Sequence, residues 1–165
     1  MQLSIAQELT QLPKFRRYFS VTAYSEGWGL YSEKLPLEFG SYKDPYSNFG
    51  RLSMELWRAC RLVVDTGIHS KKWTRDQAIQ YLADNTPSDM VENTKAIDRY
   101  IVMPGQATAY MVGMLKIFEL RKKVEAAKGK DFDLGDFHDV VLRSGAVPLG
   151  VLERRVDEYI KKATL

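Results

Sequence analysis

The chain has 165 residues, of which 45% are hydrophobic, and this is enough for one domain with a substantial core. Its net charge is only +3, with basic and acidic residues interspersed, so charge gives no argument for a nucleic-acid partner. No run approaches the roughly 18 apolar residues of a membrane span, and the N-terminus lacks the features of a signal peptide, so we expect no membrane span and, by default, a cytoplasmic location.

Nearly every segment has the hydrophobic spacing of a helix, and no period-two alternation indicates a strand. We expect helices at about 2–11, 21–38, 47–65, 75–83, 89–102, 107–127 and 134–144, and a last one from 148 onward. Residues 14–18 are expected to form a basic, aromatic connector. The prediction is a single all-α domain over 1–165, built from about seven or eight helices.

The expected helix ends rest on capping residues and glycines. Thr74 opens a capping box, while Ser47, Ser88 and Asp133 are candidate N-caps. Gly67 is expected to end the third helix. No capping residue precedes the first helix, so we expect the chain to begin within a longer helix.

The segment 22–33 is the most unusual of these helices. Glu26 and Glu33 are seven residues apart, so both face roughly the same way on a helix. Large rings with polar edges surround them, namely Tyr24, Trp28 and Tyr31. Gly27 and Gly29 each cost about 1 kcal/mol relative to alanine, which suggests that another group approaches the backbone closely. A buried helix crossing with salt-bridged carboxylates is the favoured explanation from the residues alone.

A second unusual stretch, 98–110, places a helix break at Pro104 and Gly105. Broken helices leave backbone N–H groups free to bind an anion or a carbonyl oxygen. Arg99 is suited to holding a carboxylate, and Tyr100 or Tyr110 to donating a hydrogen bond to an oxyanion. A proline-kinked core helix with Arg99 paired to an acid is an equally good interpretation.

Few residues are suited to binding a metal. The two histidines, His69 and His138, have no second histidine at ligand spacing, and the single cysteine, Cys60, excludes a cysteine-based zinc site. We expect His138 to fill a helix face. For His69, at a helix end, a structural and a functional role are about equally favoured.

Several blocks in order carry a resemblance to a known family: 24–33, 58–69, Arg99-Tyr100 with 104–107 and Tyr110, Phe132-Asp133, 137–139, and Gly145 with Pro148-Leu149. Together they resemble the bacterial family called domain of unknown function 885, over essentially the whole chain. Members of that family look like helical zinc metallopeptidases of the gluzincin type, distantly similar to thimet oligopeptidase and to angiotensin-converting enzyme. Their pattern has a His-Glu-x-x-Pro-Gly-His-His segment that binds zinc and activates water.

The resemblance assigns roles to seven residues of this sequence. It implies that Glu26 is the third zinc ligand, and that His69, Tyr100 and Tyr110 are catalytic groups near the oxyanion. It also implies that Arg99, Gln106 and Trp28 contact a peptide substrate. One departure is Met111, where the family pattern leads us to expect lysine.

The larger departure is that no His-Glu-x-x-His segment occurs in the sequence. The chain therefore resembles the C-terminal fragment of such an enzyme, without its base and two of its three ligands. We expect it to be inactive alone and to bind zinc poorly, because a lone carboxylate is a weak zinc site. The alternative is a non-catalytic helical module that associates with itself or with the missing part through an uncovered apolar face.

Overall fold

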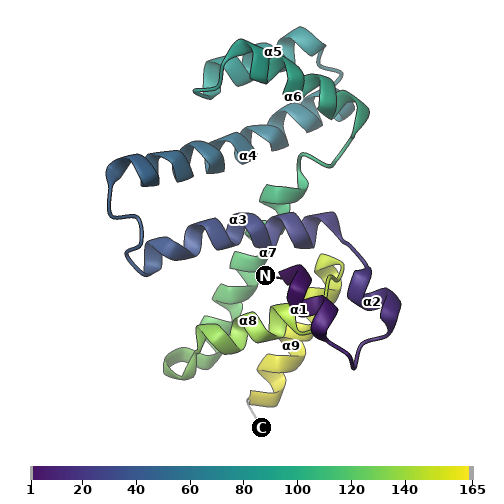
Figure 1. The fold of residues 1–165 in the computed structure, drawn as a ribbon, viewed down its shortest axis with the longest axis vertical. Coiled ribbons are helices and arrows are strands. Elements are labelled where there is room, and N and C mark those ends of the chain that lie inside the picture. Colours follow the sequence, from purple (N-terminus) through teal and green to yellow (C-terminus); the bar gives the residue numbers. More distant parts are fainter. Residues whose placement is uncertain (1, 164–165) are drawn as a thin grey trace. The chain divides into compact units, whose positions relative to one another are not determined.

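The computed structural model describes residues 2–163, which form helices and no strand (Figure 1). The prediction of an all-α chain is therefore confirmed for these residues. The backbone divides into two compact units, one formed by the residues up to Tyr31 and from Val112 onward, the other by Ser32–Met111. None of the helices described is both long and apolar enough to cross a membrane.

The first unit contains α1 (Gln2–Glu8), α2 (Lys14–Tyr18), the first part of α3 (Thr22–Glu38), most of α7 (Ala109–Lys128), α8 (Leu134–Leu142) and α9 (Leu149–Ala163). A short 3₁₀ turn, Gly129–Asp131, follows α7. The largest fully buried side chains in this unit come from α3, from α7 to α9 and from the segment before α9: Tyr31, Ile117, Leu120, Val124, Phe137, Val141, Val147, Leu152 and Val156. Within α7, α8 and α9 they follow the spacing of apolar helix faces.

The close approach suggested by the glycines is found at Gly27. A Cβ atom added there would lie 2.4 Å from the Cα atom of Gly113 in α7, whereas one added to Gly29 would meet nothing within 4 Å. Glycine is therefore required at position 27 by the contact between α3 and α7, but not at position 29.

The second unit contains the last part of α3, α4 (Pro45–Lys71), α5 (Arg75–Asn85) and α6 (Met90–Val102). Its core lies where the second half of α4 packs against α5 and α6, and includes Trp57, Cys60, Val64, Ile79, Leu82, Ile97 and Tyr100. Thr74 begins α5 with the expected capping box. In this core Cys60 is a buried apolar residue, as expected.

A charged group links the end of α3 to α4 in the second unit. Glu55 accepts a hydrogen bond from Lys34 at 2.9 Å and one from Arg51 at 2.5 Å. Burial raises the pKa of the Glu55 carboxyl, but the two hydrogen-bonded cations together outweigh it and hold the pKa below the ordinary value.

Three local predictions were wrong. Helix α4 continues to Lys71 instead of ending near 65: Gly67 lies within the helix, where the Trp73 ring packs against it, and Lys72 in the left-handed conformation ends the helix. Residues 14–18 form the short helix α2 rather than a connector. The capping side chains of α4 and α6 belong to Asp44 and Asp89, not to the serines expected.

Candidate functional site

The helix break at Pro104 and Gly105 lies in the second unit and is held by a buried carboxylate. Gly105 has a φ of +80°, a conformation that favours glycine, and its N–H donates to both carboxylate oxygens of Asp65 at 3.1 Å. Asp65 is 3% exposed. The N–H freed by the break is thus occupied by the protein itself, and the break fixes where α6 ends and α7 begins.

The break brings tyrosines from α6 and α7 to a single arginine of α4. The guanidinium carbon of Arg61 lies 4.8 Å from the ring centre of Tyr110 and 5.7 Å from those of Tyr100 and Trp57. Arg58, one turn earlier, lies 5.8 Å from the Tyr110 ring. We call these five residues the Arg61 cluster.

The charge at the centre of the Arg61 cluster is not neutralised by a carboxylate. Among the described residues no acid pairs with Arg61, whereas Arg58 reaches Glu33 at 3.5 Å. Aromatic faces attract a guanidinium without using its N–H donors. The cluster therefore presents a pre-oriented cation whose donors are suited to a carboxylate or a carbonyl oxygen.

Tyr100 adds a buried hydroxyl to this cluster. The residue is 2% exposed; its hydroxyl makes no hydrogen bond of ordinary geometry with a described residue, but Arg61 is close enough to act on it. Burial raises the pKa of Tyr100, although the Arg61 charge opposes this in part. The hydroxyl therefore stays protonated at neutral pH and is able to donate.

Four of the residues implied by the resemblance lie close to the break, namely His69, Arg99, Tyr100 and Gln106. Nε2 of His69, an exposed residue of the last turn of α4, lies 2.9 Å from the carbonyl oxygen of Tyr100. Arg99 is exposed, and its guanidinium lies 3.4 Å from the amide oxygen of Gln106. Together with Tyr110, five of the seven implied residues thus belong to the second unit.

The other two, Glu26 and Trp28, lie on α3 in the first unit. Trp28 is 4% exposed and packs against Tyr31 and the edge of His138, whose Nε2 lies 2.9 Å from the Tyr31 hydroxyl. His138 thus fills a helix face, as expected, and a substrate contact by Trp28 stays a prediction. Glu26 is half-buried in the same helix.

The donor set that a zinc ion needs is not assembled by the described residues. No group of three His, Cys, Asp or Glu side chains lies close enough to hold a metal ion. Because structural and catalytic zinc sites take three or four protein ligands, Glu26 does not make a site with the residues described.

The family model described as "Bacterial protein of unknown function (DUF885)" matches residues 1–156. The chain belongs to the DUF885 family. The comparison with curated proteins gives no match.

Two solved structures of similar proteins cover nearly the whole chain. One, described as a "putative lipoprotein" from Colwellia psychrerythraea, is 48% identical with a TM-score of 0.95 and covers 98% of the chain. The other, described as a "putative lipoprotein of unknown function" from Shewanella oneidensis, is 29% identical with a TM-score of 0.84 and covers 93%. The DUF885 chain spans 28% of the length of each of these structures.

The sequence alone did not single out Arg61. It lies in one of the blocks that carry the resemblance, but nothing in its neighbourhood along α4 marks it as different from Arg58. Only the meeting of three rings from three helices distinguishes it. The only sign of its role in the sequence is that Trp57 precedes Arg61 by four residues, which brings the two side chains together on a helix.

Proposed function

We propose that the chain is one portion of a zinc peptidase-like protein, in which it supplies the substrate side of the site and a single zinc-ligand glutamate, Glu26. Alone it holds no zinc and cleaves no peptide. The resemblance to zinc peptidases motivates the activity, and the 28% share of the length of the solved relatives supports the view that other parts of the protein complete the site.

The observation that carries this proposal is the guanidinium of Arg61, which no described carboxylate neutralises, beside the buried hydroxyl of Tyr100. Peptide hydrolysis needs donors aimed at the carbonyl oxygen, which becomes negatively charged in the transition state. A cation and a protonated phenol are such donors. The proposal assigns His69, Arg99 and Gln106, which lie at the same helix break, to the substrate side.

The test is reconstitution with the part of the Colwellia protein that this chain does not match. Zinc titration by calorimetry and hydrolysis of a peptide library are measured for the chain alone and for the mixture. We expect neither zinc binding nor cleavage by the chain alone, and both by the mixture. In the mixture, Arg61→Gln lowers hydrolysis more than Arg99→Gln, since Arg99 is exposed and bonded to Gln106.

Two results would contradict different parts of this proposal. Stoichiometric zinc binding at micromolar affinity by the chain alone would show that it carries a complete site. If the two parts associate but the mixture binds no zinc and cleaves no peptide, the peptidase assignment fails.

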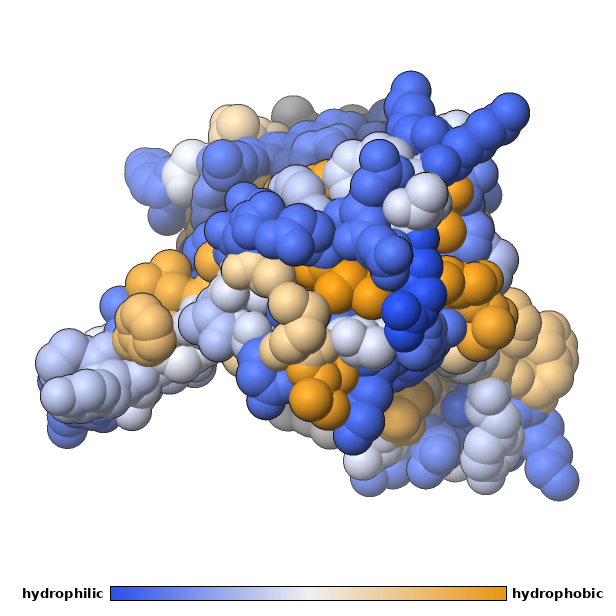
Figure 2. All heavy atoms as spheres, turned by 90° about the horizontal axis from the view of Figure 1, so that it is seen from above, coloured by the Kyte–Doolittle hydropathy of each residue, from blue (hydrophilic) through white to orange (hydrophobic). Residues whose placement is uncertain are grey.

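The second candidate is a non-catalytic module that associates through an apolar face. Phe49, Leu52 and Leu56 lie on one side of α4 and are 64%, 48% and 44% exposed. Apolar side chains also interrupt the hydrophilic surface seen in Figure 2. Such faces are typical of interaction sites. Sedimentation of the chain and of Leu52→Glu tests this candidate, which predicts an oligomer that the substitution dissociates.

A further inference from the structure

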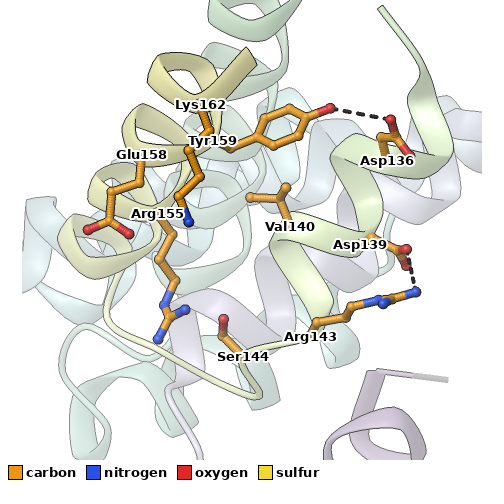
Figure 3. Close-up of a pocket in the computed structure, with 9 residues that line it drawn as sticks. All are labelled: Asp136, Asp139, Val140, Arg143, Ser144, Arg155, Glu158, Tyr159 and Lys162. Atoms are coloured by element: carbon orange, nitrogen blue, oxygen red, sulfur yellow. Dashed lines mark hydrogen bonds and ion pairs between the residues drawn. The ribbon is translucent and has the colours of Figure 1, made fainter. Parts of the chain in front are cut away.

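A polar groove of about 440 Å³ lies between α8 and α9 in the first unit (Figure 3). It contains none of the residues that the peptidase proposal uses, so what it binds does not depend on that proposal. Its volume is within the range of small-molecule pockets, roughly 300–1,000 Å³.

The groove is lined in part by the hydroxyl of Ser144, a residue that is otherwise largely buried. Ser144 is 5% exposed, and Figure 3 shows its side-chain oxygen directed into the groove. The hydroxyl bonds to none of the described residues. Arg16 donates to the carbonyl oxygens of Ser144 and Ala146 at 3.0 and 3.3 Å, which fixes the backbone at this point. The hydroxyl is open to the groove and is used by no described residue, so it is available to a group bound there.

Most of the acids around the groove already have partners. Asp139 pairs with Arg143 at 2.7 Å, and Asp136 accepts a hydrogen bond from the Tyr159 hydroxyl at 3.5 Å. Glu158 is on the rim, and its carboxylate points away from α8 in Figure 3. Of these three acids, Asp139 is therefore neutralised within the protein, and Asp136 is engaged by Tyr159.

Two cations of α9 have no such partner. Arg155 and Lys162 line the groove, and neither forms an ion pair with a described residue. They are seven residues apart, so they lie on one face of α9, two turns apart. Arginine binds phosphate oxygens in a two-pronged geometry, and lysine adds a mobile point charge.

We propose that this groove binds a phosphate group, held by Arg155, Lys162 and the Ser144 hydroxyl. The groove is larger than phosphate alone requires, and Val140 and the Tyr159 ring give it an apolar wall. A small phosphate monoester, with its organic part against that wall, is the ligand that uses both features.

The experiment is calorimetric titration of the chain with inorganic phosphate and with phenyl phosphate at low ionic strength. The chain offers matched controls, because Arg154 and Lys161 are exposed neighbours on α9 that do not line the groove. We expect Arg155→Gln and Lys162→Gln each to weaken binding about tenfold, and Ser144→Ala to weaken it several-fold. Arg154→Gln and Lys161→Gln change the net charge equally and are expected to leave affinity within about twofold.

The two ligands distinguish the source of the phosphate group. Tighter binding of phenyl phosphate assigns the groove to a monoester, and equal binding assigns it to free phosphate. Absence of saturable binding of either ligand would overturn the assignment. So would equal weakening by the control substitutions, which would show that only net charge matters. Circular dichroism confirms that each variant is folded.

Discussion

Replacing Gly27 with alanine tests the contact between α3 and α7 most sharply. The new Cβ atom would lie 2.4 Å from the Cα atom and 2.5 Å from the carbonyl carbon of Gly113, and 2.9 Å from the backbone nitrogen of Met114. All three are backbone atoms, so none can rotate away. Ordinary contact begins at 3.4 Å, and the helices must therefore separate by about 1 Å.

The size of the effect follows from two opposing terms. Overpacking of a rigid contact costs about 3 kcal/mol, the upper part of the usual range, and alanine in place of a helical glycine returns about 1 kcal/mol. The net loss in the free energy of unfolding is about 2 kcal/mol. For a chain of this length that corresponds to a fall in melting temperature of roughly 4–8 °C.

Thermal unfolding followed by far-ultraviolet circular dichroism measures this change, with Gly29→Ala as the matched control. Gly29 is in the same helix, and a Cβ atom there meets nothing within 4 Å. We expect Gly29→Ala to raise the melting temperature by roughly 2–4 °C, since only the helix-propensity term acts. If Gly27→Ala melts at or above the unmodified chain, the close contact between the two helices is refuted.

Three further substitutions follow from the second unit. Gly67→Ala is expected to destabilise the chain by about 1–3 kcal/mol in urea unfolding, because its Cβ atom would lie 2.5 Å from the Trp73 ring; an unchanged midpoint would refute that contact. Thr74→Ala removes the capping box of α5 and is expected to cost about 1 kcal/mol, while Thr74→Ser retains most of it. The pKa of Glu55 is lowered in the folded state, so its charge stabilises the fold fully above pH 4.5, and this stabilisation is lost as the pH falls through the pKa of the folded state. In Glu55→Gln, the free energy of unfolding should therefore decrease less on acidification than in the unmodified chain.

The helices could be predicted from sequence where an apolar stripe coincides with a cap. Thr74 and Asp133 begin α5 and α8 as expected, because the capping interaction is local. The end of α4 could not be predicted, since Gly67 also matches a helix stop. Gly67 could serve either as a helix stop or as a contact point for another group. The Trp73 ring makes it a contact point, and the position of that ring depends on how the chain folds back after Lys71.

The candidate site was predictable only in part. The break at Pro104 and Gly105 was found, because both residues act on the local backbone. The partner of the freed N–H, Asp65, was not found, because it lies on another helix 40 residues away. Arg61 was missed for the same reason, since its role depends on rings brought together by α4, α6 and α7.

Zinc content of a chimera tests the proposed function most directly. In it, this chain replaces the matching 28% of the Colwellia protein, and Glu26→Gln is compared with Glu33→Gln. We expect the chimera to bind stoichiometric zinc. Substituting a residue that only supports a zinc ligand lowers zinc affinity by up to roughly 100-fold, so Glu26→Gln, which removes a ligand, is expected to lower it by more. Glu33→Gln is expected to leave zinc affinity unchanged. A folded chimera that binds no zinc, or one in which the two substitutions act alike, would contradict the assignment of Glu26 as a ligand.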